Sequence, residues 1–220
     1  MNTTRPSESG IAVKSAVKRS NMPLYLIMLT CIVPMLAAVL LYYVPSLRPD
    51  GSTNYGNFVQ PQRPMPSADT LRLTTLDGKP FDLQTLKGKW LLLTSDGGAC
   101  PDSCAQKLHF TRNGHASQGK NVQRIQRVWF VTDDQPVPDK VLQAYKGTIM
   151  LRADPKALSQ FLLDEADRTG DEVAVEKKMD SYLWIIDPNG NLIMHYPGNQ
   201  TDPIRFRGDL AKLLHASTIG

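Results

Sequence analysis

The segment from Trp90 to Cys104 constrains the fold of this chain more than any other. It begins with the apolar run Trp90-Leu-Leu-Leu, bounded by Lys-Gly-Lys and Ser-Asp-Gly-Gly, which predicts a short buried strand. A glycine-rich loop follows, and Pro101 suits the first position of a helix because it has no N–H to leave unpaired. Two cysteines, Cys100 and Cys104, therefore stand where a buried strand passes into a helix.

The position of Cys100 favours a reactive thiol. As the cap of a helix, its sulfur would lie near unpaired N–H groups and the positive end of the helix dipole. Such an environment lowers a thiol pKa and favours the nucleophilic, metal-binding thiolate. The i, i+4 spacing places Cys104 on the same face of the helix. The pair could form a disulfide or bind one soft metal ion, and an inert structural pair is the third alternative.

Length and composition narrow the class of protein. The chain has 220 residues, enough for one domain of ordinary size and an appendage. Its formal net charge of +4 is mild, and the basic residues are scattered, so we expect no nucleic acid partner. Two of its three cysteines form the close pair, which indicates redox or metal chemistry more than a disulfide framework. The third, Cys31, is expected as a small apolar residue.

An uncharged run from Pro23 to Val44 predicts a membrane-spanning helix. Its length matches the roughly 30 Å hydrocarbon core of a bilayer, and Tyr25 and Tyr42-Tyr43 at its ends fit interfacial aromatic belts. A cleavable signal peptide is the alternative, but the run is long for one and no small-x-small cleavage pattern follows it. Because the basic residues precede the run, the positive-inside rule predicts a cytoplasmic N-terminus and an exported domain.

Strands and helices alternate through the rest of the chain. Continuous apolar runs predict buried strands at Val128–Thr132 and Tyr182–Ile186, and Asp77-Gly78 predicts the turn of a hairpin before Trp90. The densely charged segment Asp164–Asp180 is expected as a solvated loop. We expect helices from the cysteines to about Ser117, over Val137–Tyr145, over Lys156–Leu163 behind an Asp154 cap and from Asp202-Pro203 through His215. We also expect a short strand over Thr148–Leu151 and a hairpin strand over Asn191–Tyr196.

This order of elements predicts an α/β fold. Buried strands that alternate with helices imply a sheet covered on both faces, and the closing hairpin makes that sheet mixed. With two cysteines at the first strand-to-helix turn, this is the thioredoxin-like arrangement. We expect a disordered cytoplasmic tail over residues 1–22, a transmembrane helix over 23–44, a Pro- and Gly-rich linker over 45–67 and a thioredoxin-like domain over 68–220.

Three motifs together resemble the Sco/SenC proteins over about residues 68–218. They are Gly88-Lys-Trp-Leu-Leu-Leu, Cys100-Pro-Asp-Ser-Cys104 and Tyr182-Leu-Trp-Ile-Ile-Asp-Pro-Asn-Gly190. Three residues separate the cysteines, where ordinary thioredoxin relatives have two. Sco/SenC proteins are membrane-anchored, thioredoxin-like factors for assembly of the copper centre of cytochrome c oxidase. The resemblance implies an inner-membrane protein with a periplasmic domain, whose partner is a cytochrome c oxidase subunit or another copper or thiol client.

One position departs from the family. Sco proteins hold copper with the two cysteines and a histidine just before the penultimate strand, and here Met179 takes the place of that histidine. A thioether is a soft donor suited to Cu(I), so Met179 is a candidate ligand; the alternative is that it only packs at a strand edge. His195 in the last hairpin is the other candidate. Lys177 and Lys178, if close to the thiols, would stabilise thiolates and repel a metal cation.

Four further side chains, two histidines and two aspartates, are candidates for a role near the cysteine pair. His109 is five residues past Cys104, a poor spacing for joining the thiols, and both His109 and His115 are expected at the surface or partly buried. Asp133 and Asp134 follow the second buried strand and could lie above the sheet near the thiols. A solvated pair at the strand end is the expectation.

The missing histidine shifts the expected function from copper towards redox chemistry. We expect thiol–disulfide exchange with client cysteines, in which Cys100 is the nucleophile and Cys104 resolves the mixed disulfide. A Cu(I) carrier that uses the same two cysteines, with Met179 or His195, is the alternative. A third hypothesis is an interaction module in which the cysteines only brace the loop.

Overall fold

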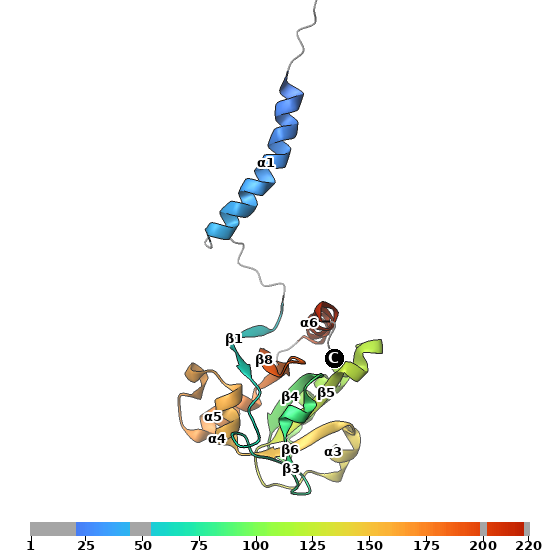
Figure 1. The fold of residues 1–220 in the computed structure, drawn as a ribbon. Coiled ribbons are helices and arrows are strands. Elements are labelled where there is room, and N and C mark those ends of the chain that lie inside the picture. Colours follow the sequence, from blue (N-terminus) through green and yellow to red (C-terminus); the bar gives the residue numbers. More distant parts are fainter. Residues whose placement is uncertain (1–20, 45–53, 199–201, 218–220) are drawn as a thin grey trace, which may run out of the picture. The chain divides into compact units, whose positions relative to one another are not determined.

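The chain divides into two compact units, residues 1–51 and 52–220 (Figure 1). The structure is a computed structural model that describes residues 21–44, 54–198 and 202–217. The expected cytoplasmic tail, up to residue 20, and the linker from 45 to 53 lie outside the described residues.

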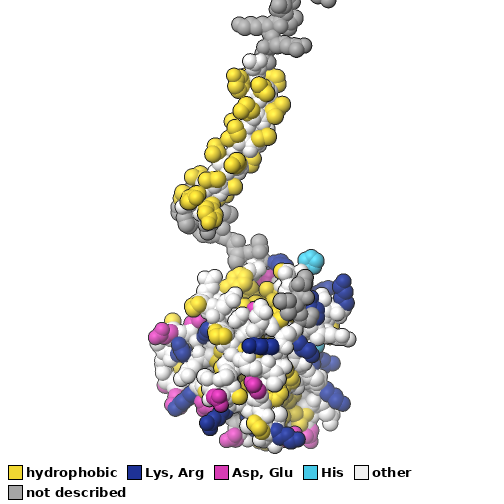
Figure 2. Space-filling model, viewed as in Figure 1, with side chains coloured by type: hydrophobic (Ala, Val, Ile, Leu, Met, Phe, Trp, Pro, Cys, Tyr) yellow, Lys and Arg dark blue, Asp and Glu magenta, His cyan; other side chains and the backbone are white. Residues whose placement is uncertain are grey.

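The first unit contains the predicted apolar helix. Helix α1 runs over Met22–Tyr43, contains Pro34 and carries no charged residue. Apolar side chains cover the face of it that Figure 2 shows, and most of its large apolar side chains are exposed. By length and composition, α1 is able to cross a membrane.

The second unit is built on one mixed sheet of eight strands, in the order β1-β8-β7-β4-β5-β6-β2-β3. Strands β4, β5 and β6 run parallel, and the remaining pairs are antiparallel. This confirms the predicted mixed sheet flanked by helices. The strands are β1 (Asn57–Pro64), β2 (Leu73–Thr75), β3 (Pro80–Phe81), β4 (Trp90–Asp96), β5 (Ile125–Val131), β6 (Thr148–Ala153), β7 (Tyr182–Ile186) and β8 (Asn191–Pro197). The helices are α2 (Asp102–Ala116), α3 (Asp139–Ala144), α4 (Pro155–Leu162), α5 (Glu172–Asp180) and α6 (Pro203–Ala216), with short 3-10 helices η2 (Leu83–Leu86), η3 (Gly119–Arg124) and η4 (Glu165–Arg168).

Helices cover both faces of the sheet, which explains the continuous apolar runs. In β4, Leu91 and Leu93 point to a core cluster beneath α4 and α5, whereas Trp90 and Leu92 point to a cluster that α6 covers on the opposite face. Neighbouring side chains of a strand point to opposite faces, so a strand buried on both sides needs apolar residues throughout. A third cluster, which contains Cys100 and lies between β5, α2 and α3, completes the core.

Most predicted elements are confirmed, with small shifts at their ends. The strand at Trp90 continues to Asp96, the strand predicted at Val128–Thr132 begins earlier, at Ile125, and the one at Tyr182–Ile186 is β7. The predicted cap of α4 is also confirmed, because the Asp154 side chain accepts a hydrogen bond from the Ala157 N–H at 2.9 Å.

The expected linker over 45–67 is wrong for its last part. Residues Asn57–Pro64 form β1, an edge strand antiparallel to β8, so the sheet begins before residue 68. The sequence shows no hydrophobic period there because an edge strand buries little, and in β1 only Val59 is buried. The Arg63 guanidinium fixes the strand by donating to the carbonyl oxygen of Leu162 at 3.1 Å.

The expected solvated loop over Asp164–Asp180 is also wrong. Its second half is helix α5, and the Asp171 side chain caps that helix by accepting from the Ala174 N–H at 2.8 Å. Only Met179 of this helix is buried. A single buried residue among charged ones leaves no apolar stripe in the sequence, and the stripe is the signal that predicts a helix.

Asp209 of α6 fixes the start of the domain. Its buried carboxylate accepts from the backbone N–H groups of Tyr55 at 2.6 Å and Gly56 at 3.1 Å, and it also pairs with Lys212 at 3.3 Å. The ring of Tyr196 would lie 2.4 Å from a Cβ atom on Gly56, so only glycine fits at this crossing. One carboxylate therefore ties the entering chain to the last helix.

Replacement of Asp209 by alanine should destabilise the domain by about 2–4 kcal/mol, because the buried N–H of Gly56 and the partly buried N–H of Tyr55 would lose their acceptor. Urea unfolding of residues 52–220 measures this change. The exposed Asp69→Ala variant removes the same charge and should change stability by less than about 0.5 kcal/mol. Equal effects of the two substitutions would contradict the role of Asp209.

Candidate functional site

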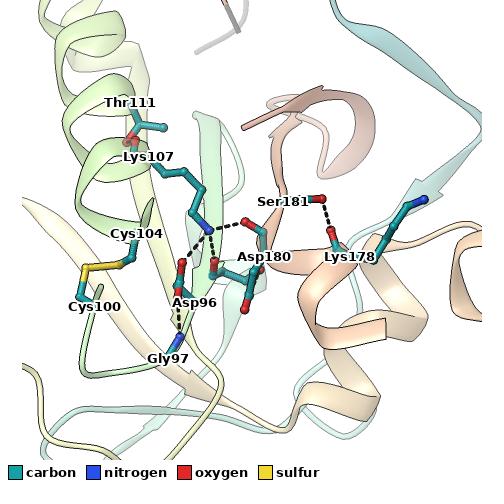
Figure 3. Close-up of polar contacts among 10 residues, drawn as sticks. Asp96, Gly97, Cys100, Cys104, Lys107, Thr111, Lys178, Asp180 and Ser181 are labelled. Atoms are coloured by element: carbon teal, nitrogen blue, oxygen red, sulfur yellow. Dashed lines mark hydrogen bonds and ion pairs between the residues drawn. A yellow bond between two sulfur atoms is a disulfide. The ribbon is translucent and has the colours of Figure 1, made fainter. Parts of the chain in front are cut away.

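Cys100 and Cys104 form a disulfide at the carboxyl end of β4 (Figure 3). The S–S distance is 2.03 Å and the two Cα atoms are 5.1 Å apart. Both residues are buried against Trp129 and Val131 of β5. Cys100 is 9% exposed and Cys104 only 1%, so Cys100 is the more accessible residue of the pair.

Cys100 does not cap the helix, contrary to the prediction. Helix α2 begins at Asp102, Pro101 occupies the cap position, and Cys100 lies one residue earlier. Its backbone has φ of +47°, the left-handed region that residues other than glycine rarely adopt. The Cys100 N–H donates to the carbonyl oxygen of Gly97 at 3.1 Å, which closes a tight turn around the sulfur. Cys100 therefore still faces the amino end of α2, but from the loop.

Asp133 anchors the cysteine loop, which the sequence did not predict. Its Oδ1 accepts from the Gly98 N–H at 2.7 Å and from the Gln135 N–H at 3.2 Å. Gly98 packs so closely that an added Cβ would lie 2.2 Å from the Gln135 carbonyl oxygen. Arg152 braces this segment from the other side by donating to the carbonyl oxygens of Asp133 and Gln135. Asp133 is thus not part of a solvated pair, whereas Asp134 is exposed as expected.

A buried lysine lies beside the disulfide, three residues after Cys104 in α2. Lys107 is 2% exposed, and its ammonium group forms an ion pair of 2.8 Å with the Asp96 carboxylate. It also donates to the carbonyl oxygen of Ser95 at 2.7 Å and to that of Asp180 (Figure 3). All three of its N–H donors are bound, which is what a buried ammonium requires. Lys107 was not among the predicted site residues, although its i, i+3 spacing from Cys104 places it near that cysteine on α2.

Two carboxylates, those of Asp96 and Asp180, lie near this ammonium group, and their negative charges repel each other. Asp96 accepts from the Gly97 N–H at 3.0 Å through its second oxygen, which links Lys107 to the cysteine loop. Asp180 accepts from the Ser95 hydroxyl at 3.3 Å. Burial first, and then the negative charge of Asp96, raise the pKa of Asp180 to about 6, while Lys107 opposes the shift.

The candidate third copper ligand Met179 is part of the hydrophobic core. It is fully buried in the cluster beneath α4 and α5, whereas the cysteines belong to another cluster. Lys178 is paired with Asp167 at 3.2 Å and points away from the disulfide, as Figure 3 shows. The cation beside the thiols is therefore Lys107, in place of the expected Lys177 and Lys178.

The histidines lie apart from the cysteine pair. His195 packs on the ring of Tyr182, with 5.0 Å between the ring centroids, and its Nε2 lies 3.4 Å from the amide of Asn57. Within residues 21–44, 54–198 and 202–217, no group of three His, Cys, Asp or Glu side chains is placed to hold a metal. His109 and His115 bind neighbouring polar groups at the surface and partly buried, respectively, as expected.

The raised pKa of Asp180 makes stability depend on pH. The pKa of Asp180 in the folded protein, about 6, lies above the ordinary value of 3.8. Its contribution to the free energy of unfolding is therefore full below pH 3.8 and is lost as the pH rises through 6. The free energy of unfolding of the wild type should fall between pH 4 and pH 7.5. In Asp180→Asn, which keeps the acceptor oxygen, this fall should be smaller by about 1–2 kcal/mol, allowing for the partial exposure of the group. Chemical denaturation at both pH values measures it. The exposed Asp134→Asn variant should keep the pH dependence of the wild type, and identical curves for all three proteins would refute this assignment.

Comparison with known proteins agrees with this geometry. A family model described as "Transmembrane-like, thioredoxin-like, C-terminal domain" matches residues 90–217. No curated protein sequence matches the chain. Among solved structures, apo Sco1 from Thermus thermophilus is 18% identical, covers 76% of this chain and 98% of its own, and has a TM-score of 0.50. A SCO1/SenC family lipoprotein from Bacillus anthracis str. Ames is 17% identical, with 70% and 98% coverage and a TM-score of 0.50.

These matches establish both the family and the fold. The family model spans more than half of the chain, including the cysteine pair, Lys107 and Asp180. The solved structures share too few identical residues to transfer a function, but they share the arrangement of the sheet and helices. The chain belongs to the transmembrane-like, thioredoxin-like C-terminal domain family, and its domain has the fold of the Sco/SenC proteins.

Proposed function

We propose that this protein is a membrane-anchored thiol–disulfide exchange factor that assists assembly of the copper centre of cytochrome c oxidase. The observation that carries the proposal is the Cys100–Cys104 disulfide at the junction of β4 and α2, with the more exposed sulfur on Cys100. The choice of an oxidase client rests on the resemblance of the three sequence motifs to the Sco/SenC proteins, with which the shared fold agrees.

The reaction is a two-step exchange. The reduced domain attacks one sulfur of a client disulfide through the Cys100 thiolate, the client S–S bond breaks, and the released client thiolate takes up a proton. Cys104 loses its proton and attacks the Cys100 sulfur, which breaks the mixed disulfide and releases the second client thiolate. Two electrons have then passed to the client, and the domain is left in the disulfide form. A thiol reductant must return it to the dithiol.

The amino end of α2 is the main source of positive potential for the thiolate. Its unpaired N–H groups lie next to Pro101 and Cys100. Lys107 adds little net field, because Asp96 pairs with it at 2.8 Å. We therefore attribute the activation of Cys100 to the start of the helix and to the tight turn that holds the sulfur there.

A Cu(I) carrier is the second candidate function. Two soft thiolates, one in the loop before α2 and one in its first turn, could bind Cu(I), which would be cargo in this case. Met179 in the core and His195 beside Tyr182 lie outside the cysteine cluster, so two thiolates would be the whole ligand set. Such a site leaves the ion open to exchange.

The location follows from α1 and from the charges around it. Arg5, Lys14, Lys18 and Arg19 precede α1, so the positive-inside rule places the N-terminus in the cytoplasm. We propose a single-pass inner-membrane protein with a periplasmic domain.

Reduced Cys100 should react with an alkylating agent faster than Cys104, with its rate rising at a pH below the free thiol value of about 8.5. Mass spectrometry of a Cys31→Ser protein, alkylated over a range of pH, separates the two rates. Cys100→Ser and Cys104→Ser serve as matched single-thiol controls. Two thiols of equal and ordinary reactivity would remove the redox assignment.

Cu(I) binding to the reduced protein should be weak and should not depend on Met179 or His195. Titration against a competing chelator, with Met179→Leu and His195→Ala as variants, measures it; leucine keeps the core volume and removes the sulfur donor. Tight one-to-one binding that either variant abolishes would favour the carrier over the exchange factor.

Alkaline phosphatase fused after Gly220 should be active, because the proposed orientation exports the C-terminal domain. A fluorescent protein that folds only in the cytoplasm, fused at the same point, should stay dark. The opposite pair of results would reverse the proposed topology.

A further inference from the structure

The surface formed by α2, η3 and α6 carries an excess of positive charge. No acidic residue occurs in the sequence between Asp102 and Asp133, and in α6 the one acidic residue, Asp209, is buried. Apart from Asp102 and the α6 cap Asp202, the charged side chains of these elements that are not buried are all basic: Arg112, Lys120, Arg124, Arg205, Arg207 and Lys212. Figure 2 shows Lys and Arg side chains along the side of the domain that carries α6 in Figure 1.

The opposite face of the sheet has the opposite charge. The segment Asp164–Asp180, which contains α5, has seven Asp and Glu against three Lys and Arg. Helix α5 packs on one core cluster and α6 packs on the cluster on the other side of the sheet. The domain is therefore a charge dipole across its sheet. Near a negatively charged surface, such a dipole turns the α6 side towards that surface.

Apolar side chains accompany the positive charge on α6. A groove of about 540 Å³ runs between α2 and α6, and Phe110, Phe206 and Ile204 are among its lining residues. Ile204 is 81% exposed, more than any other large apolar side chain in the described part of the chain. Arg207 lines the same groove, and Arg205 is the next residue after Ile204. An exposed apolar side chain flanked by arginines is typical of helices that lie in the interface of a membrane.

The chain enters the domain on this same helix. The N–H groups of Tyr55 and Gly56 are bound to Asp209, and the guanidinium carbon of Arg205 lies 5.4 Å from the centre of the Tyr55 ring. In sequence, residues 45–53 alone separate Val44, which follows α1, from the described start of the domain. A chain of this length spans at most about 35 Å. With α1 in a bilayer, the tether thus holds α6 within reach of the membrane surface at a high effective concentration.

We propose that α6 docks the domain onto the surface of the membrane that α1 spans. Ile204 lies at the boundary between headgroups and acyl chains, and Arg205 and Arg207 bind the phosphates of anionic lipids. The proposal rests on the membrane anchor proposed above and adds a second contact to it. The docked domain keeps one orientation, with its acidic α5 side turned to the aqueous phase.

The test uses the oxidised full-length Cys31→Ser protein in nanodiscs, because the Cys100–Cys104 disulfide takes up no thiol label. Ile204→Cys carries an NBD fluorophore, which lipids with a nitroxide on a shallow acyl carbon quench only where it reaches the bilayer. Quenching should be at least about twofold stronger in nanodiscs that contain phosphatidylglycerol than in pure phosphatidylcholine. The same label on Val173→Cys, an apolar position on α5 that is 72% exposed, should not be quenched in either.

Removal of charge from α6 should release the domain. In Arg205→Gln/Arg207→Gln, the ratio of docked to undocked protein, taken from the quenched fraction at residue 204, should fall about tenfold or more, because each basic residue at an anionic surface strengthens binding about fivefold. Arg72→Gln/Lys79→Gln is the matched control. It removes the same charge from exposed positions beside β2 and β3, at one edge of the sheet, and should leave the quenching unchanged.

The failures of the docking surface and of the anchor are distinguishable. Equal quenching at residue 204 in neutral and anionic nanodiscs, quenching that survives the double arginine variant, or equal quenching at residue 173 would overturn the docking and leave the anchor standing. No quenching in any nanodisc would also overturn it, and would leave the basic groove to an acidic protein. A protein that does not stay with the nanodiscs would overturn the anchor and the docking together. The cysteine pair stays oxidised throughout, so none of these results depends on the exchange reaction.

Discussion

The buried ammonium group of Lys107 is the contact on which the cysteine site depends. Taking a charge out of water costs several kcal/mol unless it is paired and its remaining donors are bound. Here, one carboxylate and two carbonyl oxygens, from β4 and from the end of α5, satisfy all three donors. These contacts tie α2, the helix that carries Cys104, to β4 and to the end of α5.

Because of these contacts, the position of α2 does not depend on whether the two sulfurs form a disulfide or remain as thiols. The contacts of Lys107 do not involve the disulfide, and those of Asp133 hold the loop from the opposite side. A redox centre that cycles between disulfide and dithiol needs such external supports, because the S–S bond is present for only part of the cycle. The same supports keep Cys100 at the amino end of α2, where a thiolate is stabilised.

The sequence predicted what depends on local patterns and missed what depends on distant contacts. The strand at Trp90, the hairpin at Asp187-Pro188 and the cap at Asp154 follow from short-range rules and are confirmed. Strand β1 and helix α5 bury one residue each, so neither leaves a periodic signal. The roles of Lys107 and Asp133 arise only when α2, α5 and the loop after β5 meet, which is a property of the folded chain. The order of elements predicted the fold and the pattern around Trp90 predicted the cysteine site, whereas the family resemblance made Met179 a ligand candidate where the structure has a core residue.

The two edges of the sheet bear on how this protein behaves at high local density. Anchored proteins crowd in two dimensions, and an open strand edge invites a second copy to extend the sheet. One edge is β1, where Pro61 and Pro64 lack N–H donors and the pairing with β8 is interrupted by an irregularity. The other edge is β3, only two residues long and beginning with Pro80. Neither offers a continuous row of donors, so neighbouring domains can meet without merging their sheets.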